Sequence, residues 1–444
     1  MEKKSIKPNL ASGFRDYLPR DAAAREWMVE TIKGVFKRFG FAPLETPGVE
    51  REEILTGGDE NFKKQIFKLN LAGQEEKTAL RFDLTVPLAR VVAGYPNEIA
   101  KPFKRYQAGN VWRGERAQAG RYREFMQFDA DIVGASAVAA DAEFISLIYE
   151  VFSALGLEKF TIRVNNRKIL NALPDYAGFP KGKAEEVLRI MDKLDKIGWK
   201  SVEAELVSGP KLKKESIARI REFLDIKGTN GEILGRVIEV FEKAGASREG
   251  ADELARLRAN IGALGVPDAN WKLDLSVARG LGYYTGMVFE VSLADCPEIG
   301  TVSAGGRYDN LVSRFGSAEI PATGGSIGVD RLFVALKKLN LFPDFSSNAD
   351  ALILNFDSDS EMVCEALATD LRRGGIAAEL YLGQEKSLKG QLAYAAKGNY
   401  PFVLIIGSEE REKEKVQVKD MKERTQEAVE RDEILGYLKN LLNL

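Results

Sequence analysis

The densest cluster of side chains that could perform chemistry lies in residues 111–134, VWRGERAQAGRYREFMQFDADIVG. Four arginines stand at the bend of a predicted hairpin, and arginine forks match the oxygens of carboxylates and phosphates. Asp129 and Asp131 follow on the outgoing strand and share one face of it with Gln127. These three side chains indicate either a polar pocket or the solvated side of an edge strand, and alternation alone favours neither.

Two further segments combine glycines with polar side chains. In residues 273–291, LDLSVARGLGYYTGMVFEV, Arg279 is set among glycines that let a backbone or a planar ligand come close. Tyr283 and Tyr284 are adjacent, so on a strand we expect one ring in the core and the other facing a ligand. The pieces SAGGRYDNLVSRFG and ATGGSIGVDRLFVAL end in Arg331 at the start of an apolar helix, and their glycine pairs are more typical of tight turns than of a nucleotide site.

The composition excludes several kinds of active site. The chain of 444 residues has no histidine and only two cysteines, Cys296 and Cys364. It therefore cannot contain a Cys/His zinc site, a Ser/His/Asp triad, a Cys/His nucleophile or an HExxH metalloprotease motif. The net charge is −2, so a polyanion would have to be bound by a local patch. The basic run of residues 101–123 is by itself more typical of a solvated face than of a phosphate site.

Length and hydropathy predict a protein of two or three domains in the cytoplasm. A chain of 444 residues exceeds one ordinary hydrophobic core. No apolar run reaches the roughly 18 residues that cross a bilayer, and the N-terminal segment lacks the apolar stretch of a secretory signal. Two isolated cysteines suit a reducing compartment. We therefore expect a cytoplasmic protein with no membrane partner.

Hydrophobic periodicity assigns the elements that must position these side chains. We expect a helix at residues 22–38, an extended stretch at 41–49, and strands at 103–112 and 124–133 joined by the charged loop. Apolar residues at helical spacing between 187 and 197 indicate a helical insertion. After residue 343, strand and helix patterns alternate, which indicates a separate α/β domain. Its expected elements are residues 352–356, 361–373, 377–382, 386–397 and 402–406.

Taken in order, these segments resemble the class II aminoacyl-tRNA synthetase family, most closely its histidyl-tRNA synthetase branch. RGLGYYTG is the specific part of the resemblance, whereas residues 113–125 and the GVDRL segment match the second and third motifs of the whole class. SGFRDYLP at residues 12–19 extends the match, and the region around Pro47 looks like the dimer-forming first motif.

The resemblance implies an α+β fold. Its parts would be a class II synthetase antiparallel sheet flanked by helices, a helical insertion, and a C-terminal α/β anticodon-binding domain. The domains would be residues 1–165 (catalytic, with motifs 1 and 2), 166–260 (helical insertion), 261–340 (catalytic, with RGLGYYTG and motif 3) and 349–444 (anticodon-binding). A homodimer is also implied.

The resemblance further implies a site for histidine and a site for ATP. Asp83 would be the countercharge of the α-ammonium, Asp131 would accept from the imidazole, and Phe125 would stack on adenine. Arg113 and Arg279 would be catalytic, gripping the carboxylate and the α-phosphate from opposite sides. The implied histidine-binding residues are Asp83, Leu84, Thr85, Arg113, Gln127, Asp131, Arg279, Tyr283 and Tyr284. The implied ATP-binding residues are Arg113, Glu115, Arg121, Phe125 and Arg331.

The implied reaction is the ATP-dependent activation of L-histidine to histidyl-adenylate, followed by transfer to the 3' end of tRNA(His). ATP and Mg²⁺ are the implied cofactors, with no metal site formed by the protein alone. The attacking carboxylate is already ionised at neutral pH, so a chain without histidine can perform this step. Gly114 and Gly282 stand where many members of the family have a histidine and an aspartate.

Two other functions are compatible with parts of this sequence. The first is a non-catalytic histidine-binding regulatory paralogue of the ATP phosphoribosyltransferase complex, which typically lacks the C-terminal domain. NADALILNF, GIAAELYLG and YPFVLIIGSEE resemble the anticodon-binding module, and the arginines of the motifs are retained, so the enzyme is favoured. The second is a class II synthetase for threonine, proline or glycine. That interpretation requires the RGLGYYTG match to be accidental.

Overall fold

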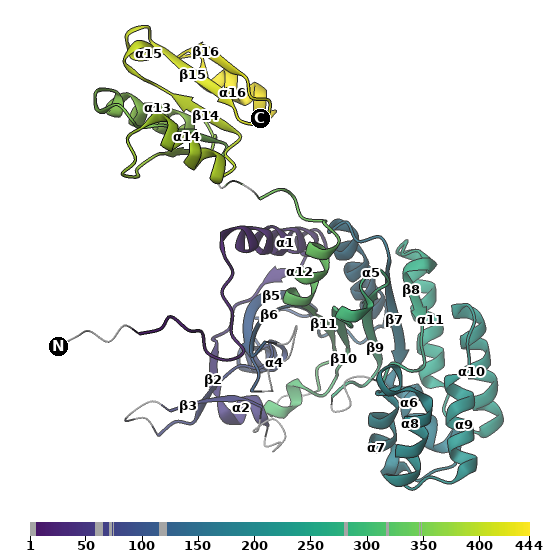
Figure 1. The fold of residues 1–444 in the computed structure, drawn as a ribbon. Helices are drawn as coiled ribbons and strands as arrows, with labels where there is room; N and C mark the ends of the chain where they lie inside the picture. Colours follow the sequence, from purple (N-terminus) through teal and green to yellow (C-terminus); the bar gives the residue numbers. More distant parts are fainter. Residues whose placement is uncertain are drawn as a thin grey trace. The chain divides into compact units, whose positions relative to one another are not determined.

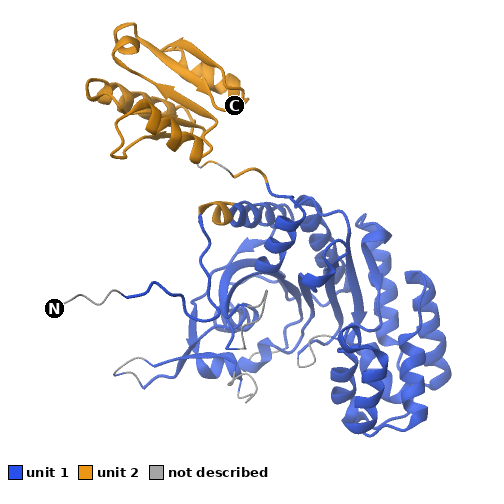
Figure 2. Ribbon diagram, viewed as in Figure 1, with its two compact units in different colours: residues 1–18, 24–342 blue, residues 19–23, 343–444 orange. Residues whose placement is uncertain are grey.

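The computed structural model describes residues 6–57, 65–70, 73, 75–114, 122–278, 283–316, 319–345, 347 and 349–444. The chain divides into two compact units, residues 1–18 with 24–342 and residues 19–23 with 343–444 (Figure 2). Among the described residues, no helix is long and apolar enough to cross a membrane.

The larger unit is built on an antiparallel sheet (Figure 1). Its eight described strands run in the order β1-β5-β6-β11-β10-β9-β7-β8, and the pairs β1–β5 and β7–β8 at the two edges are parallel. A second small sheet has the order β2-β4-β3. The strands are β1 (Ala42–Pro43), β2 (Val49–Arg51), β3 (Phe67–Leu69), β4 (Thr78–Leu80), β5 (Phe103–Trp112), β6 (Glu124–Val133), β7 (Phe160–Asn166), β8 (Trp271–Leu273), β9 (Met287–Leu293), β10 (Ser303–Arg307) and β11 (Ala322–Gly328). The predicted hairpin strands are confirmed as β5 and β6, with the same bounds.

The register of the central strands gives the sheet one polar face. Asp131 of β6 lies opposite Arg105 of β5 and Gly324 of β11, and residues directly opposite one another point to the same side. Asp129, two residues from Asp131, points the same way. Because β6 lies between β5 and β11, it is a central strand, and the edge-strand interpretation of its polar residues is wrong.

The other face of the sheet is apolar and is covered by helices α1 (Pro19–Arg38) and α5 (Val138–Ala154). Phe36 of α1 packs edge-on against Phe128 of β6, with ring centroids 5.0 Å apart. Phe144 of α5 meets Phe289 of β9 at 5.6 Å. Burying these rings fixes which way β6 faces, because adjacent strand residues point to opposite sides.

Glycine pairs 305–306 and 324–325 lie side by side in the middle of β10 and β11. On the polar face, a Cβ atom on Gly324 would lie 2.0 Å from Oδ1 of Asp131. On the apolar face, the other glycine of each pair makes room for the ring of Phe289. We expected these pairs in tight turns, and that prediction is wrong because both are paired strand residues whose missing side chains leave space on either side of the sheet.

Six helices follow β7 and gather at one side of the larger unit (Figure 1). Rings of Tyr176, Phe223 and Phe241 pack together between them, with centroids 5.5 to 6.2 Å apart. The predicted apolar stripe of residues 187–197 is only partly correct, since α7 ends at Met191 and Ile197 is exposed. The helices are α6 (Arg167–Ala177), α7 (Ala184–Met191), α8 (Leu194–Ser208), α9 (Lys214–Leu224), α10 (Asn230–Ala244) and α11 (Glu249–Ala263). The remaining described α-helices of this unit are α2 (Glu52–Thr56), α4 (Thr85–Gly94) and α12 (Val329–Lys338).

The C-terminal unit is a separate α/β fold, as its alternating pattern predicts. Its strand order is β13-β12-β14-β15-β16, in which β13, β12 and β14 are parallel and the last two strands are antiparallel. The strands are β12 (Ala351–Ile353), β13 (Ala378–Leu380), β14 (Phe402–Ile405), β15 (Lys415–Asp420) and β16 (Gln426–Glu430), and the helices are α13 (Glu361–Arg373), α14 (Leu388–Lys397), α15 (Ser408–Glu412) and α16 (Ile434–Leu442). We did not predict β15 and β16; Val429 is the buried residue of β16, which is too little for an alternation signal.

Adding a side chain at one of the paired glycines of β10 and β11 should destabilise the larger unit. In Gly305→Ala, the new Cβ would lie 2.1 Å from the carbonyl oxygen of Gly324, so we expect the free energy of unfolding to fall by about 1–3 kcal/mol. The control Gly235→Ala lies on an exposed position of α10 with open space around it and should gain about 0.5–1 kcal/mol. Urea unfolding followed by circular dichroism measures both; equal midpoints for the two variants would contradict the prediction.

Candidate active site

A cavity of about 360 Å³ opens on the polar face of the sheet. Its inner wall is formed by β6 and by the glycine-containing strands β10 and β11. Side chains from the start of α4 and from the segment before β9 complete it. The lining residues that carry polar groups include Asp83, Thr85, Arg113, Gln127, Asp129, Asp131, Tyr283, Tyr284, Tyr308 and Ser326.

Asp83 enters this cavity from the turn that begins α4. Its Oδ1 accepts a hydrogen bond of 3.2 Å from the backbone N–H of Val86, in the first turn of the helix. Desolvation nevertheless raises the pKa of Asp83 to about 6, against the opposing effects of that hydrogen bond and of Arg113. Thr85 lines the cavity with it, whereas the side chain of Leu84 is buried behind the wall and its carbonyl oxygen accepts from Arg105 at 3.3 Å.

Asp131, which also lines the cavity, is engaged by two partners. Its Oδ2 lies 2.5 Å from Nη2 of Arg105, and both side chains are almost fully buried. The hydroxyl of Tyr308 donates to its other oxygen, Oδ1. Burial raises the pKa of both Asp131 and Tyr308. Arg105 and Tyr308 thus hold this carboxylate in one orientation.

Asp129 and Gln127 each present an oxygen with no hydrogen-bond partner among the described residues. Asp129 is 2% exposed, and its Oδ1 is such an oxygen, as is Oε1 of Gln127. The amide of Gln127 donates to Oγ of Ser326 at 2.6 Å, and the Ser326 hydroxyl is a hydrogen-bond partner of the Asp129 carboxyl. Burial raises the pKa of Asp129 to about 7, although the positive charge of Arg105 opposes that shift. The cavity wall therefore presents buried oxygens without a hydrogen-bond partner among the described residues on Gln127, on Asp129 and also on Asp131, whose Oδ2 is ion-paired with Arg105.

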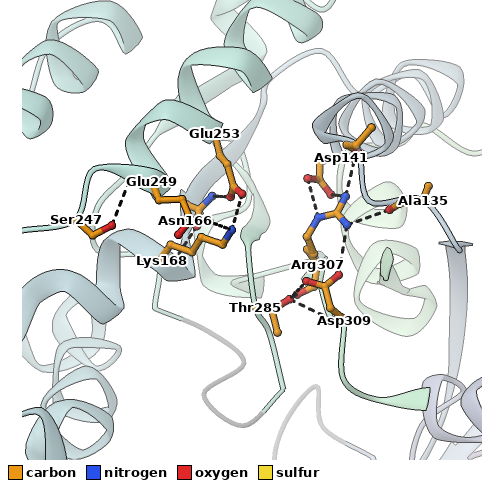
Figure 3. Close-up of polar contacts among 11 residues, drawn as sticks. Ala135, Asp141, Asn166, Lys168, Ser247, Glu249, Glu253, Thr285, Arg307 and Asp309 are labelled. Atoms are coloured by element: carbon orange, nitrogen blue, oxygen red, sulfur yellow. Dashed lines mark hydrogen bonds and ion pairs between the residues drawn. The ribbon is translucent and has the colours of Figure 1, made fainter. Parts of the chain in front are cut away.

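Tyr283 and Tyr284 both line the cavity, which corrects the expectation that they point to opposite faces of a strand. They precede β9, so the strand alternation does not apply, and their hydroxyls lie 3.5 Å apart. The next residue, Thr285, donates from its backbone N–H to the carbonyl oxygen of Arg307 at 2.8 Å and from its hydroxyl to Asp309 at 2.5 Å (Figure 3). The tyrosine pair is therefore anchored at its C-terminal side.

Arg307 is a buried clamp at the end of β10 (Figure 3). Its Nη2 lies 2.9 Å from Asp141 in the first turn of α5, and its Nη1 lies 3.4 Å from Asp309. Its Nη1 and Nη2 also donate to the carbonyl oxygens of Ala135 and Ala137, at 3.0 and 3.2 Å. The guanidinium of Arg307 is ion-paired, and its N–H groups donate to the oxygens named above. Arg307 therefore holds the segment that carries the tyrosines from outside the cavity.

Arg113 lines the same cavity. Its Nε donates to the carbonyl oxygen of Phe82 at 3.2 Å, and its guanidinium lies 5.1 Å from the ring centre of Phe125. Arg113 and Phe125 are therefore brought together. Of the implied histidine-binding residues that the structure describes, all except Leu84 line this cavity. The implied roles of Glu115, Arg121 and Arg279 fall on positions outside the described residues.

A second cavity, of about 660 Å³, contains Arg331 and lies beside the first. Glu290 of β9 lines it, and Glu290 is the register partner of Ala304, which lines the first cavity. Arg331, in the first turn of α12, donates to the carbonyl oxygen of Thr301 at 2.7 Å. The two cavities therefore open on the same face of the sheet at neighbouring strands.

Arg163 of β7 organises the acids of the second cavity. Its Nη1 lies 2.7 Å from Glu290 and 2.7 Å from Asp195 of α8, and its Nε lies 2.7 Å from Asp274. Nη2 donates to the hydroxyl of Ser276 at 2.8 Å. The two arginines share this cavity with Glu290 and with further acids, Asp192, Asp195, Glu298 and Asp330. Mg²⁺ prefers oxygen ligands and is commonly shared between carboxylates and phosphates, so with this cation the cavity suits a polyphosphate. Among the described residues, no group of three metal-ligating side chains is found.

Several residues of these two cavities were not identified by the sequence analysis. Arg105 and Tyr308 hold Asp131, Glu290 and Arg163 line the second cavity, and Arg307 anchors the tyrosines. A single charged residue inside an apolar strand, as in MVFEV around Glu290, is the one sequence signal that could have indicated a site.

Comparisons with known proteins agree with this arrangement. The histidyl-tRNA synthetase family model matches residues 13–332, and an anticodon binding domain model matches residues 350–441. A histidine–tRNA ligase of Wolinella succinogenes is 43% identical over 423 residues, covering 95% of each chain, and one of Clostridium tetani is 41% identical over 446 residues, covering 99% of this chain and 100% of the other. The crystal structure of histidyl-tRNA synthetase from Nostoc sp. PCC 7120 matches with a TM-score of 0.87 and 31% identity, covering 98% and 100% of the two chains.

The antiparallel sheet with its two cavities, together with these matches, defines a class II aminoacyl-tRNA synthetase. Within that class, the chain belongs to the histidyl-tRNA synthetase family. The resemblance based on RGLGYYTG and the two shared motifs is therefore confirmed, and so is the fold class that it implied.

The buried carboxyl of Asp129 should make the unliganded protein less stable as pH rises. Its folded-state pKa of about 7 exceeds the unfolded value near 4, so the folded state binds more protons between these pH values. The free energy of unfolding should therefore fall from about pH 4 to about pH 7 and stay low above it. Asp129→Asn removes this ionisation and should raise the free energy of unfolding at pH 8 by up to ~4 kcal/mol.

Urea unfolding of the wild type and Asp129→Asn at pH 5 and pH 8 measures this effect. We expect the advantage of the variant to be larger at pH 8 than at pH 5. The control Asp175→Asn replaces an exposed carboxylate of α6 and should show the same small change at both pH values. An Asp129→Asn advantage that is absent at pH 8 would contradict the prediction.

Proposed function

We propose that this chain activates L-histidine with ATP to form histidyl-adenylate and transfers the histidyl group to the 3' end of tRNA(His). The observation that supports this most is the pairing of Glu290 with Ala304, which sets a carboxylate- and tyrosine-lined cavity beside one that contains both arginines and carboxylates. Membership of the family supports the same reaction.

The smaller cavity is the proposed site of histidine. Asp83, Thr85 and Oε1 of Gln127 are acceptors for the three hydrogens of the α-ammonium group. Tyr283 and Tyr284 border the imidazole. A ring that both donates and accepts hydrogen bonds suits this wall, and an apolar competitor would leave its buried polar groups unpaired.

The larger cavity is the proposed site of ATP with Mg²⁺. Arg331 would face the phosphates, and Glu290, which Arg163 holds through an ion pair, is the carboxylate that would share the metal ion with them. Bound Mg²⁺ would neutralise charge on the phosphates. Phe125, together with Glu115 and Arg121, is proposed from the family pattern to contact the rest of the nucleotide.

The first step requires charged side chains in fixed positions. No side chain has to accept or donate a proton in that step. A carboxylate oxygen of histidine attacks the α-phosphorus, a new P–O bond forms, and pyrophosphate leaves. Arg113 and Arg279 are proposed to stabilise the charge that spreads over the α-phosphate, because guanidinium groups stay protonated. In the second step a ribose hydroxyl of tRNA attacks the acyl carbon and AMP leaves.

Further parts of the chain are assigned within the same proposal. Residues 349–444 would contact the anticodon region of the tRNA, residues 1–165 and 261–340 would form the catalytic domain, and residues 166–260 would form the insertion. We also propose a homodimer through the region around Pro47 and a cytoplasmic location, where tRNA is charged. The alternative function, a regulatory paralogue without activity, is not favoured, because the relatives named as ligases match over nearly the full chain, including the anticodon-binding part.

Exchange of pyrophosphate into ATP, measured with each of the twenty amino acids, tests the activation step. We expect exchange with histidine alone, and a loss of roughly 100-fold or more in Arg113→Gln and in Arg279→Ala, because each removes a charge that faces the transition state. Arg236→Gln, on the exposed side of α10, is the matched control and should exchange like the wild type. Histidine binding with no exchange would favour the regulatory paralogue.

Separate measurements of KM for ATP and KM for histidine in two variants test the assignment of the two cavities. Arg331→Gln should raise KM for ATP by about tenfold or more, because it removes a charged donor, and should change KM for histidine little. Tyr284→Phe removes one neutral hydroxyl and should raise KM for histidine by roughly 3- to 10-fold with little change for ATP. The reverse pattern would exchange the two assignments.

A further inference from the structure

The N-terminal segment of residues 12–18 has no part in the function proposed above, yet it is attached to the larger unit at several points. The ring of Tyr17 lies edge-on to that of Phe333 in α12, with centroids 5.9 Å apart. The backbone N–H of Arg123, the residue before β6, donates to the carbonyl oxygen of Gly13 at 2.8 Å. The segment therefore contacts both α12 and the start of β6, and these two elements border the larger cavity.

Arg15 of this segment bonds to two residues that line the larger cavity. Its Nη1 donates to the hydroxyl of Tyr122 at 3.3 Å, and its guanidinium lies 4.2 Å from the centre of that ring. Its Nη2 lies 3.1 Å from Oδ1 of Asp330. Arg15 is not itself a lining residue, so it contacts the wall of the cavity and not the space inside it.

The carboxylate of Asp330 is occupied by partners within the protein, although the residue lines the cavity. Its Oδ1 accepts from the hydroxyl of Tyr17 and lies 3.3 Å from Nη2 of Arg25, in addition to Arg15. Its Oδ2 accepts from the backbone N–H of Met126 at 3.0 Å. Two guanidinium groups therefore offset the charge of this acid, which would otherwise oppose the binding of a polyphosphate.

These contacts connect two parts of the cavity wall that come from distant segments of the chain. Asp330 and Arg331 are adjacent in the first turn of α12, whereas Tyr122 lies two residues before β6. Asp330 bonds directly to Met126 of β6, and Arg15 bonds to both Asp330 and Tyr122. The position of Arg331 relative to Tyr122 therefore depends on the N-terminal segment.

Resting on the function proposed above, we propose that Arg15 and Tyr17 are positioning residues for ATP, which hold Tyr122 and Asp330, and with Asp330 the neighbouring Arg331, where the nucleotide requires them. Neither positioning residue touches the nucleotide. A planar guanidinium donates in two fixed directions, so Arg15 bonds to the tyrosine and to the carboxylate at the same time. The ammonium group of a lysine has the charge but not this geometry.

Calorimetric titration of the full chain with ATP and Mg²⁺, and separately with histidine, tests the role of Arg15. Arg15→Gln should weaken ATP binding by roughly 5- to 50-fold, because charged hydrogen bonds are lost, and should change histidine binding by less than about twofold. Arg25 remains as a counterion of Asp330, so the variant should fold. The control Arg236→Gln, on the exposed side of α10, should bind both ligands like the wild type. An equal loss for both ligands, or no loss for ATP, would overturn the proposal.

The conservative variant separates position from charge. Arg15→Lys keeps the positive charge and should still bind ATP roughly threefold or more weakly than the wild type, since it cannot stack on Tyr122 and bond to both partners. Affinity equal to the wild type would reduce the role of Arg15 to its charge and overturn the positioning role.

A double-mutant cycle tests whether Arg15 acts through Tyr122. The factor by which Arg15→Gln weakens ATP binding should be at least about threefold smaller in Tyr122→Leu than in the wild type, because residues in contact couple. In the Arg236→Gln background the factor should be the same as in the wild type. Equal factors in the Tyr122→Leu and wild-type backgrounds would overturn the proposal.

Tyr17→Phe removes only the hydroxyl that donates to Asp330, so it keeps the proposal testable if Arg15→Gln does not fold. It should weaken ATP binding by roughly 2- to 10-fold at an unchanged affinity for histidine, and an unchanged affinity for ATP would overturn the role of Tyr17. If the wild type binds ATP but exchanges no pyrophosphate with histidine, the proposed function fails, whereas weaker ATP binding in Arg15→Gln still supports this inference. If the wild type exchanges and Arg15→Gln binds ATP normally, only this inference fails. A wild type that does not bind ATP overturns both.

Discussion

The register of one antiparallel sheet is the constraint on which both cavities depend. Phe128 and the residues that alternate with it on β6 are buried against α1, so Asp129 and Asp131 must point to the opposite side. The same alignment brings Arg105 from β5 and Glu290 from β9 onto that side. A slip of one residue between β5 and β6 would drive buried rings into the cavity and carboxylates into the core, so hydrophobic burial on one face fixes the chemistry on the other.

The site relies on groups that hold a fixed charge instead of groups that carry protons. Arginines remain cationic at any physiological pH, and the acids are placed where each either neutralises one of them or lines a cavity. Keeping Asp83 and Asp129 out of water raises their pKa values to about 6 and about 7, which costs stability in the empty protein. A ligand that carries a positive charge or a hydrogen-bond donor removes part of this cost in stability when it binds. The unliganded structure therefore already favours such ligands over apolar ones.

Local patterns in the sequence predicted the elements, and contacts between distant segments decided the details of the site. The bounds of β5, β6 and α13 follow from strong periodicity and clear breaks at their ends. The pairing of Arg105 with Asp131, of Tyr308 with the same carboxylate, and of Arg163 with Glu290 joins residues that are 26 to 177 positions apart, and no local pattern encodes such pairs. The same holds for the glycine pairs, whose meaning depends on the ring of Phe289 and the carboxyl of Asp131.

The contacts of Arg307 connect helix α5 with the segment that carries the tyrosine pair. Asp141 belongs to α5, which packs on the apolar side of the sheet, while Thr285 follows the tyrosine pair that lines the cavity on the polar side. One guanidinium contacts both Asp141 and Asp309, which accepts from Thr285, so the positions of α5 and of the segment that carries the tyrosine pair are linked through Arg307. A helix on the apolar side of the sheet thereby helps to hold the tyrosine wall of the cavity on the polar side.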